Sequence, residues 1–196
     1  RGGRIKVVNS RFENNRCEAT GPDVGGAALR VLSQFQGLPA YVVGSTFGGA
    51  PGLGNTCSNG GALSSIGVSH KVLNSELSYN QVTGWRANPP QSGTPGGGSG
   101  GAIYNDGNTF HLTVCGSSIH DSTAIEGGGA IFFVSNNLTG TLTVDRTWIW
   151  NCPSQGFWTA PWPWLFYLGS GPPLIANSTF DEPPPDLFCD GFESQG

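Results

Sequence analysis

The sequence predicts an all-β protein whose chain winds into a solenoid, a parallel β-helix of about six coils. The first observation is a six-residue phrase that occurs six times. Its positions hold, in order, an aliphatic residue, any residue, Asn or Gly in most copies, a hydroxyl residue, any residue and a large apolar residue. The copies occupy residues 7–12, 42–47, 72–77, 114–119, 144–149 and 175–180. Their hydroxyl residues lie 35, 30, 42, 30 and 31 positions apart. Because so short a repeat cannot bury a core alone, successive copies are expected to stack.

The second observation is that each position of the phrase keeps its chemistry when the copies are aligned. The first residue is always Val or Ile, and the last is Phe, Leu or Ile. The residue before the hydroxyl is Asn, Gly or, once, Arg146, and Asn and Gly tolerate left-handed backbone angles. The phrase therefore predicts a strand, a one-residue bend and a second strand, with both apolar residues and the hydroxyl pointing inward. The hydroxyls of Ser10, Ser45, Ser75 and Ser117 are expected to form a buried ladder bonded to neighbouring backbone.

The third observation is Gly-Gly-Ala followed by an apolar residue, at 60–63, 100–103 and 128–131, with a small last residue at 25–28. The glycines allow a tight corner, after which Ala and the apolar residue are expected to enter the core. Two or three short strands then make up each turn. Repeats of one phrase at this spacing fit a β-helix better than a β-sandwich.

The composition agrees with short strands joined by tight turns. The 196 residues include 32 glycines and 14 prolines, and only 11% are charged. We expect one β-helix domain over residues 1–180 and a C-terminal tail over 181–196. Pro and Gly at 87–101 lengthen the third coil, which predicts a protruding loop, either a surface insertion or a binding loop. No charged-then-apolar leader occurs at Arg1, so a mature or processed chain is expected.

Two motifs resemble the repeats of bacterial polymorphic outer-membrane proteins and related secreted right-handed β-helices. They are Phe-x-x-Asn at 12–15, with a looser copy at 77–80, and the Gly-Gly-Ala-apolar corner; the copies at 119–122 and 149–152 lack the Asn. The ending Leu-Phe-Cys-Asp-Gly-Phe-Glu at 187–193 is similar to a tail on many secreted bacterial proteins. The resemblance covers residues 1 to about 150. It implies a right-handed coil and a secreted or surface location, and it carries no catalytic residues.

The five cysteines are spread one per coil, without the paired spacing of a metal site. Cys17 and Cys57 fall in loops of consecutive repeats, and so do Cys152 and Cys189. Stacking would bring each pair together, so both pairs are candidate disulfides, which favours an oxidising, extracellular setting. Cys115 is then left over, either as a packed free thiol or as half of an intermolecular bridge.

An aromatic and Pro-rich segment at 148–168 is expected to cap the last coils, and it holds five of the six tryptophans. Three roles stay open for its side chains: a plug over the last coils, a protein interface or a glycan platform. An aromatic cluster of this size should not lie wholly in water. The candidate contact residues are Trp148, Trp150, Trp158, Trp162, Trp164 and Tyr167.

Charge and spacing argue against several functions. The net charge is −4 and the nine basic residues are dispersed, which is unlike a nucleic-acid-binding surface, and no stretch is apolar enough to span a bilayer. The acidic residues are scattered and not paired as in polysaccharide hydrolases and lyases. His70 and His111 occupy similar offsets in adjacent coils, close enough to approach each other, but two histidines make a weak metal site and polar surface positions explain them more simply. We predict no catalytic residue, no cofactor and no metal ligand.

These observations predict a secreted or surface-exposed bacterial protein with a structural or adhesive role. Since the first strand follows almost directly on Arg1, little sequence is left to cover the first coil. Its edges are expected to be covered by upstream residues removed from this chain, by another domain or by another copy of the chain. Head-to-tail contacts propagate into filaments unless they close. The alternative is a protein that binds or degrades polysaccharide. The expected partners are the chain itself, another surface protein or a glycan.

Overall fold

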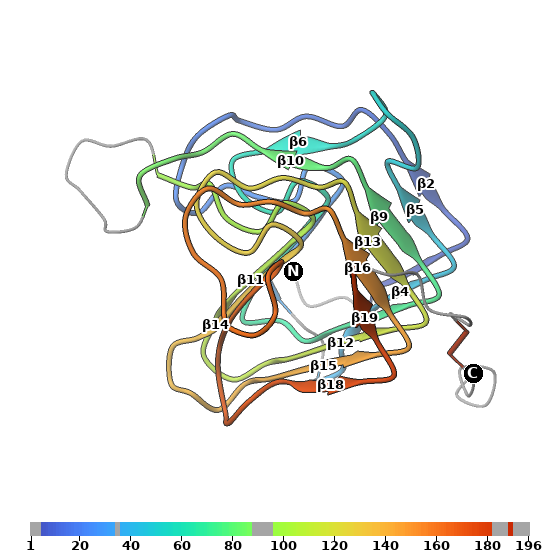
Figure 1. Ribbon diagram of the computed structural model, residues 1–196, viewed down its shortest axis with the longest axis vertical. Helices are drawn as coiled ribbons and strands as arrows, with labels where there is room; N and C mark the ends of the chain where they lie inside the picture. The colour runs from blue at the N-terminus through green and yellow to red at the C-terminus, as the bar shows by residue number, and fades with distance from the viewer. Residues whose placement is uncertain (1–4, 34–35, 88–95, 182–187, 190–196) are drawn as a thin grey trace.

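The computed structural model describes residues 5–33, 36–87, 96–181 and 188–189. They form a parallel β-solenoid of about five turns (Figure 1), which confirms the predicted all-β parallel β-helix. The prediction of about six coils was one too many. Six copies of the phrase bound only five windings, because the last copy begins a turn that the described residues do not complete.

Three parallel sheets run along the solenoid. Sheet I contains β1 (Lys6–Val8), β4 (Ala40–Val43), β8 (His70–Leu73), β12 (His111–Cys115), β15 (Thr141–Asp145) and β18 (Leu174–Ala176). Sheet II contains β2 (Arg11–Phe12), β5 (Thr46–Phe47), β9 (Glu76–Ser78), β13 (Ser118–His120), β16 (Trp148–Trp150) and β19 (Thr179–Phe180). Sheet III contains β3 (Leu29–Val31), β7 (Leu63–Ile66), β11 (Ile103–Gly107), β14 (Ile131–Ser135) and β17 (Leu165–Leu168). A shorter pair joins β6 (Thr56–Cys57) to β10 (Gln81–Val82).

Equivalent residues of the phrase lie directly over one another along the solenoid. Val42 pairs with Val7 on one side and Val72 on the other, and Val114 pairs with Val72 and Val144. In the inner turns these side chains are fully buried. The stacking of repeats inferred from the sequence is therefore confirmed at the level of single residues.

The one-residue bend between sheets I and II is left-handed in every copy, as predicted. The φ angles at the six bend positions fall between 44° and 60°, at Asn9, Gly44, Asn74, Gly116, Arg146 and Asn177. This bend resets the alternation of side chains, so that the residues on both sides of the corner point inward. Arg146 adopts the same angle despite its Cβ, and its guanidinium pairs with Asp145 at 2.9 Å.

The hydroxyl residues form the expected ladder at this corner. The Oγ of Ser45 donates to the carbonyl of Val43 and accepts the backbone N–H of Ser10, at 2.9 and 3.1 Å. Ser75 accepts from Ser45 in the same way, and Ser117 accepts from Ser75. Each hydroxyl thus satisfies backbone groups of two successive coils, which a buried corner requires.

A second buried ladder follows sheet II, on the Asn of the Phe-x-x-Asn motif. The Oδ1 of Asn80 accepts the backbone N–H and the side-chain N–H of Asn55, at 3.0 and 2.9 Å, while its Nδ2 donates to the carbonyl of Phe47 at 3.0 Å. Asn15 stacks on Asn55 through the same contacts. In the later turns Ser122 takes this position, and its Oγ accepts the N–H of Asn80.

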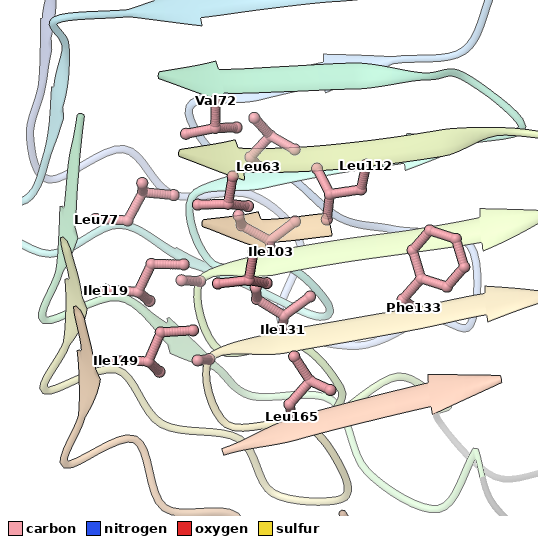
Figure 2. Close-up of a cluster of buried hydrophobic side chains, with 14 of the residues drawn as sticks. Leu63, Val72, Leu77, Ile103, Leu112, Ile119, Ile131, Phe133, Ile149 and Leu165 are labelled. Carbon is pink, nitrogen blue, oxygen red and sulfur yellow. The ribbon is translucent and has the colours of Figure 1, made fainter. Parts of the chain in front are cut away.

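The apolar core fills the interior from all three sheets (Figure 2). Leu63, Ile103, Ile131 and Leu165 enter it from sheet III, and each is fully buried. The labelled residues of the other sheets that face them are Val72, Leu77, Leu112, Ile119 and Ile149.

The Gly-Gly-Ala corner precedes sheet III, and both of its glycines are required. The first glycine has positive φ, for example 69° at Gly100 and 59° at Gly128. The second lies against the backbone of the next coil: a Cβ on Gly129 would come within 3.0 Å of the Cys152 carbonyl, and one on Gly101 would meet the Gly129 carbonyl equally closely. In the three full copies the Ala and the apolar residue that follow are buried, as predicted. The copy predicted at 25–28 is wrong by one residue: Leu29 pairs with Leu63, so the corner there begins at Gly26, and its residues are partly exposed.

The predicted insertion at 87–101 and tail at 181–196 are only partly described. Residues 88–95 lie outside the described residues, whereas 96–100 are buried and Gly98 donates a hydrogen bond to the Ser58 carbonyl. Of the tail, Asp181, Phe188 and Cys189 are described. The returning half of the insertion is thus part of the solenoid wall.

Candidate functional site

The six aromatic residues predicted to form one cluster lie in three places. Trp148 and Trp150 project from the outer face of sheet II, on β16. Trp158 is 54% exposed in the connection between β16 and β17. Trp162 and Trp164 pack against the core at the last turn, and Tyr167 lies inside it. Of these groups, only Trp162, Trp164 and Tyr167 pack on the core where the C-terminal cap was predicted.

Three of these residues are held by contacts within the chain. The Tyr167 hydroxyl lies 3.3 Å from the carbonyl oxygens of both Gly140 and Ser170, and burial raises its pKa. The Trp164 Nε1 donates to the Asp181 carboxylate at 3.1 Å. Trp162 and Trp164 cover the end of the core. For them the plug is the interpretation that the contacts favour: it covers core side chains at the last turn, while β17, β18 and β19 each keep one edge unpaired among the described residues.

Trp148 and Trp150 belong to a larger surface cluster, which we call the acidic aromatic face: Glu76, Tyr79, His120, Asp121, Trp148 and Trp150. The two indoles stack with centroids 5.0 Å apart and an interplanar angle of 10°. The His120 ring stacks on Trp150 at 5.2 Å and receives the edge of Tyr79 at 5.7 Å. All of these rings are partly buried, so each shelters its neighbours from water.

Two carboxylates hold His120 from opposite sides. Its Nδ1 lies 2.9 Å from Asp121 Oδ2, and its Nε2 lies 3.4 Å from Glu76 Oε1. Glu76 also accepts the Ser78 hydroxyl at 2.8 Å, and Asp121 accepts the Asn151 amide. The imidazole is thus fixed in plane, beside two indoles whose Nε1 atoms are buried without a hydrogen-bond partner among the described residues.

The register of sheet II explains why these residues meet. Glu76 and Trp148 each come one position after the hydroxyl residue of their phrase, and they lie on the two strands that pair with Ser118. His120 and Trp150 each come three positions after the hydroxyl residue, and they pair with each other. Positions one and three share the outward face of a strand. The sequence analysis missed Glu76, His120 and Asp121 as site residues. The period-two offset was a signal that could have found Glu76 and His120, but Asp121 follows the strand at offset four, where the alternation no longer applies.

The arrangement suits binding. Half-buried aromatic rings offer apolar surface to a sugar ring or to an apolar side chain, and the carboxylates of Glu76 and Asp121 accept hydrogen bonds at the rim. The part of the chain that the structure describes holds no group of three or more His, Cys, Asp or Glu side chains arranged to hold a metal ion.

The two other histidines do not approach each other, and only His111 is the surface residue that the sequence favoured. His70 pairs with Leu112, the residue after His111, so the two histidines are one position out of register and face opposite sides of sheet I. His70 is buried in the core, where its Nδ1 lies 3.1 Å from the Val68 carbonyl. His111 is exposed, and its Nδ1 lies 2.8 Å from the Thr141 hydroxyl.

His70 makes the fold sensitive to acid. Burial lowers its pKa to about 4, while the unfolded chain takes up this proton near pH 6.5. The contribution of the neutral, buried imidazole to the free energy of unfolding is therefore fully present above pH 6.5. We expect the free energy of unfolding to fall by up to about 3 kcal/mol as the pH drops to 4. Denaturant titrations at pH 7.0 and 4.5 measure this fall. His70→Leu, which matches Leu112 in the column, should reduce it markedly; an equal fall in H70L and the wild type would refute the assignment, and His111→Leu is the control.

One of the two predicted disulfides is present in the structure. Cys17–Cys57 is confirmed, with Cα atoms 4.8 Å apart. The predicted Cys152–Cys189 bond is wrong: Cys189 pairs with Cys115, at a Cα separation of 5.7 Å, and Cys152 is the free cysteine. Cys152 takes the place of Asn80 in the inward column of sheet II, so its thiol is buried and its pKa is raised by burial. Cys115 follows the inward Val114 and therefore faces outward.

The Cys115–Cys189 bond fastens the C-terminal segment to the side of the solenoid. The Asn74 amide accepts the Cys189 N–H at 2.8 Å and donates to its carbonyl at 3.3 Å. Gly116 leaves room for this contact, because a Cβ there would lie 2.6 Å from the Cys189 nitrogen. Phe188 and Cys189 are thus placed beside the bend between sheets I and II.

Comparisons with known proteins return no match: no protein-family model, no curated protein and no solved structure is significantly similar to this chain. Within the described residues, the structure contains no helix long and apolar enough to cross a lipid bilayer. The class that the fold defines is therefore a disulfide-bonded parallel β-solenoid.

Proposed function

We propose that this chain is a secreted or cell-surface bacterial β-solenoid with a non-catalytic, structural and adhesive role, and that copies of it associate end to end. Two disulfides support an extracellular location, since such bonds persist in oxidising compartments. The resemblance to surface-protein repeats points to the same location.

The observation that carries the proposal is that, among the described residues, the strands at both ends of the solenoid are paired on one edge only. The first and last strands of each sheet are hydrogen-bonded on one edge only. Strands β1, β2 and β3 pair only with the following coil, and β17, β18 and β19 pair only with the preceding coil. The inward column that is fully buried at Val72 and Val114 is partly exposed at Val7 and Ile175. Unpaired strand edges beside partly exposed apolar side chains favour association with further strands.

The two ends also match each other. In an end-to-end pair, Val7 of one copy follows Ile175 of the other, and Phe12 follows Phe180, so each inward column continues with the same kind of residue. The hydroxyl ladder has a direction, because each backbone N–H donates to the hydroxyl of the next coil. The N–H of Ser178 and the Oγ of Ser10 would extend it across the junction in the same sense.

The test places a like charge at the junction. Thr179 and Arg11 occupy the same outward column, at opposite ends. Thr179→Arg would set two arginines about 4.8 Å apart between copies, and we expect it to weaken association at least tenfold by light scattering and sedimentation. Adding Arg11→Glu should restore association.

The matched control is Thr143→Arg, which adds the same charge to a partly exposed outward position on β15, a strand of sheet I that is paired on both sides. It should leave association unchanged. Wild-type protein that stays monomeric at high concentration, or equal loss with Thr143→Arg, would contradict end-to-end association.

A second candidate function, binding of polysaccharide, is favoured by the acidic aromatic face. There the partly exposed indoles of Trp148 and Trp150 lie next to the carboxylates of Glu76 and Asp121. Aromatic anchors with neighbouring acceptors are typical of binding hot spots. The same face would serve adhesion if the ligand is a surface glycan.

Retention on a panel of insoluble and immobilised polysaccharides tests this candidate. Trp150→Ala is expected to lower retention about tenfold or more, as for an aromatic hot spot, and Glu76→Gln should lower it without removing a ring. Trp158→Ala removes an exposed indole outside the face and serves as control. No retention of the wild type on any polysaccharide, or the same loss in all three variants, would exclude the acidic aromatic face as a glycan site.

A further inference from the structure

The outer face of sheet I carries a cationic site. The chain has only two lysines, Lys6 and Lys71, and both lie in the outward column of sheet I, one strand to either side of Tyr41. Their Nζ atoms lie 5.9 and 5.8 Å from the centroid of the same tyrosine ring. We call these three residues the lysine pair site.

Neither ammonium group forms an ion pair within the part of the chain that the structure describes. No carboxylate among the described residues lies within 4.0 Å of Lys6 or Lys71. The outward columns of sheet I contain one acidic residue, Asp145, and it pairs with Arg146 at 2.9 Å. This face is therefore locally positive on a chain whose net charge is −4, while Glu76 and Asp121 lie on the face of sheet II.

The site has the form of a short row along the solenoid axis. Lys6 and Lys71 are two strands apart, roughly 10 Å at a strand spacing of about 4.8 Å. The phenol of Tyr41 lies between them, and the hydroxyls of Thr113 and Thr143 continue the column. An occupant that fits this row is an extended chain with spaced negative charges and many hydroxyl groups.

We propose that the lysine pair site binds an acidic polysaccharide, whose uronate carboxylates contact the two lysines while its hydroxyls and ring faces contact Tyr41, Thr113 and Thr143. Cation–π contacts hold each ammonium over the tyrosine ring and leave its remaining N–H groups free for a carboxylate. The site is separate from the acidic aromatic face and does not depend on end-to-end association.

Charge complementarity favours a sparsely charged polysaccharide over the other polyanions. Recognition of anionic lipid uses clusters of four to eight basic residues, and nucleic acid needs a basic patch or stripe on one face. Two lysines separated by a tyrosine are too few and too widely spaced for either. A uronate chain, in contrast, presents single carboxylates at intervals along its length.

The experiment measures binding of the full chain to immobilised polygalacturonate at several sodium chloride concentrations, with neutral dextran as reference. Lys6→Gln and Lys71→Gln are each expected to weaken binding about fivefold, equivalent to about 1 kcal/mol per lysine. Each change should also lower the slope of log affinity against log salt by about one. Tyr41→Leu should weaken binding while the circular dichroism spectrum stays unchanged.

Arg86→Gln is the matched control. It removes the same charge from a cation that also lies over an aromatic ring, at 4.6 Å from the Trp85 centroid, but stands outside sheet I. It should change affinity less than twofold. As a second readout, acetylation of the two lysines, mapped by mass spectrometry, should be slowed by bound polygalacturonate.

Three results would overturn the proposal: no binding to polygalacturonate beyond that to dextran, equal loss with Arg86→Gln, or binding of equal strength to phosphatidylglycerol vesicles or single-stranded DNA. None of these measurements reads association between copies. Failure of the lysine pair site therefore leaves end-to-end association standing, and failure of that association leaves the site standing.

Discussion

Replacing Gly129 with alanine is expected to lower the free energy of unfolding by at least about 3 kcal/mol, the upper range for an overpacked core. The added Cβ would come within 3.0 Å of the Cys152 carbonyl, which belongs to the backbone of the next coil and cannot rotate away. Because coils stack without gaps, relief requires the separation of two turns. The melting temperature should fall by roughly 6–12 °C.

Gly52→Ala separates this steric effect from loss of glycine's conformational freedom. Gly52 has a φ of 81° but nothing within 4 Å of its Cβ position, so its replacement costs only backbone strain, on the order of 1 kcal/mol. Thermal and denaturant unfolding of both variants gives the comparison. Equal losses for G52A and G129A would show that the contact between coils is not the cause.

Removing the Asn80 side chain is expected to be almost as damaging. Asn80→Ala leaves two N–H groups of Asn55 and the carbonyl of Phe47 without their partner in a fully buried corner. An unsatisfied buried polar group costs about 1–3 kcal/mol, so a loss of about 3–5 kcal/mol follows unless water enters. Denaturant titration at neutral pH measures it.

Asn15→Ala is the control for this effect. Asn15 stands at the partly exposed end of the same ladder and donates only to Asn55 Oδ1. Water can replace its amide, so we expect a loss of about 1 kcal/mol or less. If N15A and N80A lower the free energy of unfolding equally, the asparagine ladder does not stabilise the fold by satisfying buried polar groups.

The repeat was predictable from sequence because each of its positions follows a local rule. Asn and Gly marked the left-handed bend, β-branched residues marked the strand before it, and the hydroxyl marked the buried corner. Side-chain alternation with period two then determined what faces inward. The same rule, carried one residue past Val114, puts Cys115 outside and would have excluded it as the packed free thiol.

The disulfide partner of Cys115 could not be obtained that way. Cys189 is 74 residues further along the chain, and its position depends on where the C-terminal segment meets the bend, beside Asn74 and Gly116. No repeat covers that segment. Cys152 was misassigned because it was placed in a loop, whereas it occupies the inward position of the asparagine ladder.

The two proposed binding faces could be found only from the sequence and the tertiary structure together. Tryptophans at 148 and 150 were recognised as candidates, but their companions His120 and Glu76 come from one and two coils earlier and meet them only through the register of sheet II. Lys6 and Lys71 reach Tyr41 in the same manner in sheet I.

By itself, the sequence determined that this chain winds into stacked coils, where each coil bends, and which apolar columns of the repeat fill its interior, because these features depend on residues a few positions apart. The tertiary structure alone decided how many turns form, which cysteines bond and which distant side chains share an outer face. Those outcomes depend on register between strands that are distant in the chain, and a shift of one residue, as between His70 and His111, moves a side chain from the surface into the core.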